Sequence, residues 1–145
     1  MQHVTIDWKD EALSVSPVSL WRDDQSIMWS FAPKADPRLY WGGVPGVVFQ
    51  PAGGKYVDWP GTRPQPLGLV PENGNDRRNY LANGESPNLG TDVIYYHYDL
   101  HLHLPTGETV RLSELLASRR APLVVGSGPG SVEWIDPEIP NQPQP

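Results

Sequence analysis

Three of the four histidines in this chain fall within one segment of ten residues, 95–104. In that segment tyrosines and leucines alternate with a polar set made of His97, Asp99, His101 and His103. Alternation with a period of two predicts a β-strand with one apolar and one polar face. Because imidazole nitrogens are common ligands of zinc and copper, the polar face is a candidate metal site.

The spacing along this strand decides which histidines could share a metal ion. His101 and His103 should lie about 7 Å apart on one face, whereas His97 should lie about 13 Å from His101. His101 and His103 are therefore the candidate ligands for zinc or copper. A third ligand would have to come from a neighbouring strand, such as one bearing His3, Asp7 or Glu133. The alternative is a solvated sheet face that binds no cofactor.

The residues that follow the strand predict a hairpin and its register. In Leu104-Pro105-Thr106-Gly107-Glu108, the proline suits the start of a type I turn and the glycine suits the left-handed position after it. This loop predicts the pairs Leu104–Glu108, His103–Thr109, Leu102–Val110 and His101–Arg111. A guanidinium beside His101 would oppose a divalent cation, which weakens the metal hypothesis.

An enzymatic alternative uses the same strand. His101 and His103, followed by Glu108, resemble the core of the first cupin motif, which would imply a metalloenzyme. The glycines of that motif are replaced by Tyr95 and Leu115, and the hairpin register keeps Glu108 away from the histidines. No histidine follows residue 103 to form a second motif. These departures favour a protein that is not an enzyme.

The rest of the chain has the pattern of an all-β protein. Alternating residues predict strands at 4–8, 27–31 and 131–135, and shorter apolar runs predict further strands at 13–15, 18–21, 46–49 and 123–125. Residues 113–118 predict the one short helix, with Ser113 as its N-cap. Short strands separated by glycine and proline predict a two-sheet antiparallel Greek-key β-sandwich, cupredoxin-like or immunoglobulin-like, with long loops rich in these two residues.

Strand order and aromatic positions also carry a wider resemblance. The chain resembles small bacterial cupredoxin-like proteins of unknown function in the order of Val15-Ser16-Pro17-Val18, Ser26-Ile27-Met28-Trp29-Ser30-Phe31, Gly46-Val47-Val48-Phe49, Tyr95-Tyr96-His97-Tyr98-Asp99-Leu100 and Asp136-Pro137-Glu138-Ile139-Pro140-Asn141. The resemblance spans residues 4–141 and implies a Greek-key β-sandwich without copper ligands. It implies no reaction.

Length and composition set outer limits on organisation and partners. The 145 residues fit one domain, expected over residues 1–140, with an extended proline-rich tail at 141–145. The net charge of −6 argues against nucleic acid as a partner. The absence of cysteine excludes disulfides, thiol catalysis and a blue-copper centre. With no signal peptide and no apolar run long enough for a membrane span, we expect a soluble cytoplasmic protein.

The segment 50–92 is the candidate for specific function. It is rich in proline and glycine, and only residues 55–59 within it resemble a strand. An ordered loop of this length is usually functional, and aromatic side chains are costly to leave in water. The loop therefore either folds back on the sheets or presents an aromatic platform that binds a protein, a glycan or a second copy of the chain as a homodimer. The predicted platform residues are Trp41, Tyr56, Trp59 and Tyr80.

Overall fold

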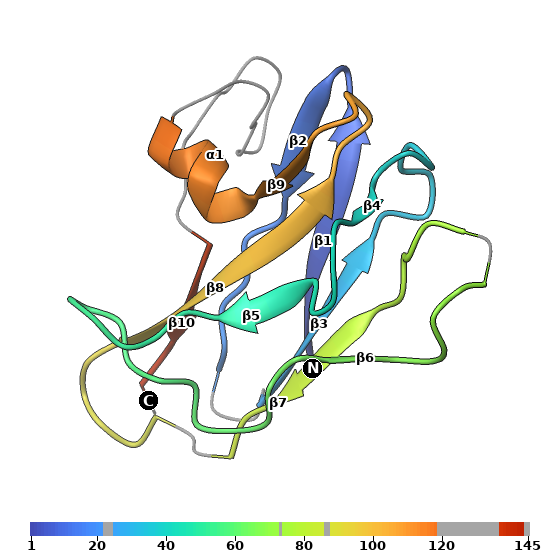
Figure 1. Ribbon diagram of the computed structural model, residues 1–145. Coiled ribbons are helices and arrows are strands. Elements are labelled where there is room, and N and C mark those ends of the chain that lie inside the picture. The colour runs from blue at the N-terminus through green and yellow to red at the C-terminus, as the bar shows by residue number, and fades with distance from the viewer. Residues whose placement is uncertain (22–24, 73, 86–87, 119–136, 144–145) are drawn as a thin grey trace.

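The computed structural model describes residues 1–21, 25–72, 74–85, 88–118 and 137–143. Within them the chain forms β1 (Gln2–Lys9), β2 (Ala12–Val15), β3 (Ser26–Phe31), β4 (Tyr40–Trp41), β5 (Val47–Phe49), β6 (Gln65–Pro66), β7 (Tyr80–Asn83), β8 (Ile94–His103), β9 (Thr109–Arg111), α1 (Leu112–Ser118) and β10 (Glu138–Asn141). The strands form two sheets (Figure 1), so the predicted all-β class is confirmed. The strands predicted at 123–125 and 131–135 lie outside the described residues.

The first sheet has the strand order β2-β1-β3-β7-β6. Its pairs are antiparallel except for β1 and β3, which run parallel from Gln2 opposite Ile27 to Ile6 opposite Phe31. The prediction of a wholly antiparallel fold is therefore wrong here. After β2 the chain leaves this sheet and touches β10 of the other, where Leu20 N donates to Pro140 O at 2.8 Å. That excursion lets β3 enter from the same end as β1.

The second sheet is built around β8, with β9 and β10 along one edge and β4 and β5 along the other. The predicted hairpin register is confirmed, because His101 pairs with Arg111 and His103 with Thr109. Leu104 N donates to Glu108 O at 2.8 Å, and Gly107 has a φ of 96°, in the left-handed region that glycine tolerates.

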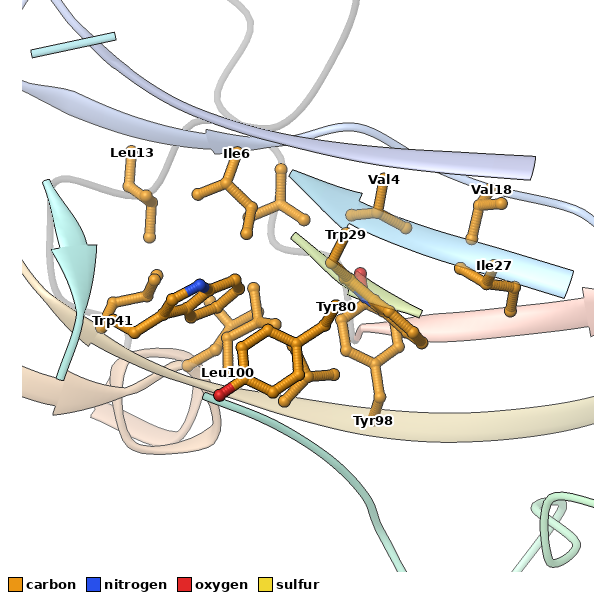
Figure 2. Close-up of a cluster of buried hydrophobic side chains, with 14 of the residues drawn as sticks. Val4, Ile6, Leu13, Val18, Ile27, Trp29, Trp41, Tyr80, Tyr98 and Leu100 are labelled. Carbon is orange, nitrogen blue, oxygen red and sulfur yellow. The ribbon is translucent and has the colours of Figure 1, made fainter. Parts of the chain in front are cut away.

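The apolar faces of the two sheets meet in one core. Figure 2 shows Val4 and Ile6 of β1 facing Tyr98 and Leu100 of β8, with Trp29 between them. The ring centroids of Trp29 and Tyr98 lie 5.5 Å apart in an edge-to-face contact. Burial raises the pKa of the Tyr98 phenol, so this side chain stays neutral in the folded protein. The period-two prediction for β1, β3 and β8 thus places the correct residues in the core.

The segment 50–92 contains more strand than its sequence predicts. Within it, β6 and β7 belong to the first sheet, and β7 pairs with β3 along its whole length. The predicted strand at 55–59 is wrong, since only Tyr56 in that range forms isolated bridges, with Gly53 and Tyr95. β6 has only two residues and β7 four, too few for a clear alternation, so packing against β3 decides their conformation.

The helix α1 is confirmed, but its N-cap is not the predicted one. Ser113 lies inside the first turn, where its backbone N donates to Asp99 Oδ1 at 2.9 Å and its Oγ donates to Asp99 Oδ2 at 2.7 Å. A carboxylate from β8 therefore satisfies the helix terminus, where negative charge is favoured. No helix in the described part of the chain is long and apolar enough to cross a membrane.

The C-terminal segment enters the fold further than predicted. The prediction starts the extended tail at Asn141, yet this residue belongs to β10. Asn141 is buried, and its side-chain Nδ2 donates to Tyr96 Oη at 3.1 Å. Its backbone carbonyl accepts a hydrogen bond from Asn88 Nδ2 at 2.9 Å. The amide nitrogen and the backbone carbonyl of Asn141 are thus satisfied, whereas its buried Oδ1 has no hydrogen-bond partner among the described residues.

Candidate functional site

The polar face of β8 is largely covered by neighbouring residues. The ring of His97 stacks on Tyr56, with centroids 4.4 Å apart and an interplanar angle of 17°. His103 stacks on Tyr40 at 4.5 Å and 19°, and its Nδ1 lies 3.0 Å from Thr109 Oγ1. Both histidines are therefore half-buried in separate aromatic contacts.

His101 and Asp99 are covered in other ways. His101 lies against the backbone of Gly42 and Gly43, where a Cβ added to Gly43 would stand 2.7 Å from His101 Nδ1. Any side chain at Gly43 would force the imidazole to move. Asp99 is 2 % exposed and already accepts hydrogen bonds from Ser113. This carboxylate is thus committed to α1 and is not free to bind a ligand.

The candidate metal ligands share a face, as their spacing predicts. The strands beside His101 and His103 are β4 and β9, and His3 and Asp7 belong to β1 of the other sheet. Glu133 lies outside the described residues. Among the residues that the structure describes, no group of three or more His, Asp or Glu side chains could hold a metal ion. Zinc or copper at His101 and His103 stays a prediction.

Two of the four predicted platform residues, Trp41 and Tyr80, lie in the core. Trp41 is 3 % exposed, its ring lies 4.9 Å from that of Tyr80, and its Nε1 donates to Arg78 O at 2.6 Å. Tyr80 is fully buried, and its Oη accepts a hydrogen bond from Gly46 N at 2.8 Å. These two aromatics bind the turn before β5 to β7, and they present no surface to a partner.

The third platform residue, Tyr56, holds the loop after β5 against the second sheet. Its Oη donates to Glu138 Oε2 at 3.0 Å, and the same carboxylate lies 2.9 Å from Lys55 Nζ. The Lys55 ammonium also lies 4.4 Å from the ring centroid of Tyr95, a favourable cation–π distance. With its stack on His97, Tyr56 makes an anchor between the loop, β8 and β10.

The fourth platform residue, Trp59, is half-buried and lines an open groove. Its ring stacks on Phe49 with centroids 4.6 Å apart and an angle of 11°, and meets Tyr96 edge-on at 5.0 Å. A Cβ on Gly84 would stand 3.2 Å from the Trp59 ring, so this glycine allows the backbone to approach the indole closely. Trp59 is therefore supported on several sides by the fold.

The groove has a volume of about 910 Å³ and is lined by residues of the chain segments that contain β5 and β6. Its walls come from residues 44–51 and 58–66, two segments that residues 52–57 separate. The lining is mainly apolar, with the exposed side chains of Asp58 and Arg63 as its charged groups. The lining residues are Val44, Pro45, Val47, Val48, Phe49, Gln50, Pro51, Asp58, Trp59, Gly61, Arg63, Pro64, Gln65 and Pro66.

Sequence reasoning found one residue of this groove, Trp59, and missed the rest. The available signal was the recurrence of proline at 45, 51, 64 and 66 beside Phe49 and Trp59. These prolines by themselves indicate only loops, because nothing in a single sequence shows that the segments 44–51 and 58–66 face one another. Tertiary structure brings them together to form a largely apolar concave surface, the usual character of a binding site.

Two Asp-x-Arg pairs fix the loops near Trp41. Arg38 Nη2 lies 2.8 Å from Asp36 Oδ2, and Arg78 Nη2 lies 2.8 Å from Asp76 Oδ2. The hydrogen bond from Arg38 holds the pKa of Asp36 at about 2, and the hydrogen bond from Arg78 lowers the pKa of Asp76. The backbone carbonyl of Asp76 also accepts a hydrogen bond from the backbone N of Trp41 at 2.8 Å.

Comparison of the chain with protein-family models, with curated proteins and with solved structures finds no match.

Proposed function

We propose that this protein is a non-enzymatic binding module whose ligand occupies the groove between β5 and β6. We further propose that its two sheets form a Greek-key β-sandwich of the cupredoxin-like kind. The observation that carries the functional proposal is an open groove of about 910 Å³ with a supported aromatic stack, Trp59 on Phe49, in its lining. Concave, mainly apolar surfaces with a few charged groups are typical of ligand sites.

The groups that line the groove favour binding over catalysis. Asp58 and Arg63 are its charged residues, and Asp58 Oδ1 already accepts a hydrogen bond from Ala52 N at 3.0 Å. A nucleophile paired with a base, or two facing carboxylates, would be needed for most hydrolytic reactions. Neither arrangement is present among the lining residues. One carboxylate and one guanidinium are instead suited to orienting a ligand on an apolar surface.

Protein segments and glycans are the ligand classes that such a surface suits. The exposed parts of Trp59 and Phe49 offer flat apolar area that binds at little cost in side-chain entropy. Gln50 and Gln65, which also line the groove, add amide donors and acceptors. Prolines at the rim are rigid, so the groove is shaped before a ligand binds and less ordering is required on binding.

The proposal is tested by substituting a rim residue that the fold does not need. Val44 lines the groove and is 69 % exposed, so Val44→Asp should leave folding intact while placing a charge at the rim. Leu89→Asp is the matched control, since Leu89 is 77 % exposed and lies outside the groove lining. Labelled protein is applied to a phage-displayed peptide library and to a glycan array.

The expected result is at least one peptide or glycan bound by wild-type protein and by the Leu89→Asp variant, with the signal reduced at least tenfold by Val44→Asp. Binding that Val44→Asp leaves unchanged would place the site elsewhere and contradict the proposal. So would a wild-type protein that retains no peptide, no glycan and no second copy of itself.

A further inference from the structure

An exposed apolar loop lies directly beside the groove. The chain leaves β6 at Pro66, a groove residue, and continues through Leu67, Leu69 and Val70 toward β7. Leu69 is 92 % exposed and Val70 60 % exposed. This loop, residues 67–70, projects from the side of the two sheets, at the right in Figure 1.

The loop is held in its exposed conformation by defined contacts at its base. Leu67 N donates to Asn79 O at 2.8 Å, and Arg78 Nη1 donates to Gly68 O at 3.1 Å. Arg78 is itself fixed by Asp76 at 2.8 Å. Gly68 has a φ of 90°, a conformation that favours glycine, and the chain turns there so that Leu69 faces solvent. A loop ordered in this way loses little conformational entropy when it is bound.

The exposed loop and the groove are chemically matched to each other. The loop carries three aliphatic side chains, and the groove is lined by valines, prolines and the Phe49–Trp59 stack. Val44, which lines the groove, is 69 % exposed as well. Exposed apolar side chains on both the loop and the groove lining are of the kind that interaction sites carry.

The charges in the groove are also self-complementary. Asp58 and Arg63 both line it, and Arg63 makes no ion pair with any residue in the described part of the chain. In a two-fold dimer each contact occurs twice with the partners exchanged, so Arg63 of each copy could face Asp58 of the other. One residue of each sign in one groove is the minimum needed for such a reciprocal pair.

We infer that the occupant of the groove is a second copy of this chain, whose loop 67–70 inserts Leu69 into the groove while its own groove receives the loop of the first copy. The inference rests on the proposed function, because it assigns a partner to the same groove. Loop and groove adjoin on each molecule, so one two-fold axis near Pro66 brings both reciprocal insertions together.

The first test removes the inserted residue. Wild-type protein should show a concentration-dependent dimer by sedimentation velocity, and Leu69→Asp should weaken the dimer at least tenfold. Leu89→Asp should dimerise like wild-type protein, because Leu89 is also exposed, at 77 %, but belongs neither to the loop nor to the groove lining. Far-ultraviolet circular dichroism should be unchanged in both variants, since each side chain lies mainly in solvent in the single chain.

The second test exchanges the groove charges. Asp58→Arg and Arg63→Asp should each dimerise at least tenfold more weakly than wild-type protein, because two like-charged pairs face one another. An equimolar mixture of the two variants should form a heterodimer, since both cross pairs are then Asp opposite Arg. The double variant Asp58→Arg/Arg63→Asp should form a homodimer again. Heterodimer formation is read from a size difference given by a fusion tag on one variant.

A wild-type protein that stays monomeric at the highest concentration would overturn the inference. So would a dimer that Leu69→Asp and both charge variants leave unchanged, because its interface would lie elsewhere. In either case the proposed function is judged separately, by whether Val44→Asp removes a peptide or glycan that wild-type protein binds. A monomer that still binds such a ligand through the groove refutes the inference and supports the proposed function.

Discussion

At the scale of single residues, the two tryptophans of the predicted platform have different environments. Trp41 contacts Phe31 and Tyr80 in the core, at centroid distances of 4.8 and 4.9 Å, whereas Trp59 lines an open groove. The sequence places both tryptophans beside a proline-rich loop and does not show which of them is buried. Their burial in the structure distinguishes their roles, because an indole in the core contributes to stability whereas an indole in a groove can also contact a ligand.

Trp41→Ala should lower the free energy of unfolding by about 4 kcal/mol, since it removes a buried indole and leaves a cavity. It also removes the donor that reaches Arg78 O at 2.6 Å. Trp21→Ala is the control, because Trp21 is 56 % exposed and its removal should change stability little. Urea denaturation followed by circular dichroism measures both. Equal effects from the two substitutions would contradict the burial argument.

The histidines of β8 lead to a prediction about metal content. Purified protein should contain less than one equivalent of zinc, copper, nickel, iron or manganese, because the hairpin places Arg111 beside His101 and no group of three ligands occurs among the described residues. Elemental analysis by mass spectrometry measures this directly. A full equivalent of metal that is lost in the His101→Ala/His103→Ala variant would instead establish the metal-site alternative.

At the scale of elements, the short helix α1 depends on one carboxylate from a distant strand. Asp99 accepts hydrogen bonds from both the backbone N and the Oγ of Ser113. Asp99→Ala should therefore destabilise the protein by about 2 kcal/mol, the upper range for loss of an N-cap, since Ser113 is left with unsatisfied donors. Hydrogen exchange should show faster opening of residues 112–118 than of β1.

The control for this substitution is Asp7→Ala, a half-buried aspartate on β1 that caps no helix. Its effect on exchange in α1 should be absent. If Asp99→Ala leaves both stability and helix exchange at the wild-type level, the capping contact does not contribute to the fold.

The sequence correctly predicts the long strands β1 and β8, and its short apolar runs at 13–15 and 46–49 correspond to β2 and β5. β1 and β8 have eight and ten residues, enough for the period-two pattern to place Val4, Ile6, Leu100 and Leu102 in the core. β4 and β6 have two residues each, and no periodicity exists over such a length. Their conformation comes from pairing with β8 and β7, which are distant in sequence.

At the scale of the whole molecule, the two Asp-x-Arg pairs make the stability of the fold decrease at acidic pH. Asp36 has a pKa of about 2 in the folded protein, and the pKa of Asp76 is also lowered, each by an arginine hydrogen bond. A lowered pKa in the folded state stabilises the fold when the unfolded chain would also be ionised. The contribution is complete above the ordinary aspartate value of 3.8 and is lost as the pH falls toward 2.

Asp76→Asn should lower the melting temperature at neutral pH and should flatten its fall between pH 4 and pH 2, because one of the two titrating groups is gone. Asp92→Asn is the control, since Asp92 is exposed and has no ion-pair partner among the described residues. Differential scanning calorimetry at a series of pH values measures the slope. An unchanged acid slope in Asp76→Asn would contradict the assignment of this pair.

The sequence by itself determined a strand over residues 95–104, which the structure forms as Ile94–His103, together with its apolar face and the register of the hairpin that follows it. These features depend on residue periodicity and turn geometry, which act between neighbours in the chain. Tertiary structure alone decided what covers the polar face of that strand, where Asp99 caps α1 and His97 stacks on Tyr56. It also decided the groove, in which the ring of Phe49 on β5 stacks on that of Trp59 in the loop that follows. Contacts between distant segments depend on the global arrangement of the sheets, which no local pattern encodes.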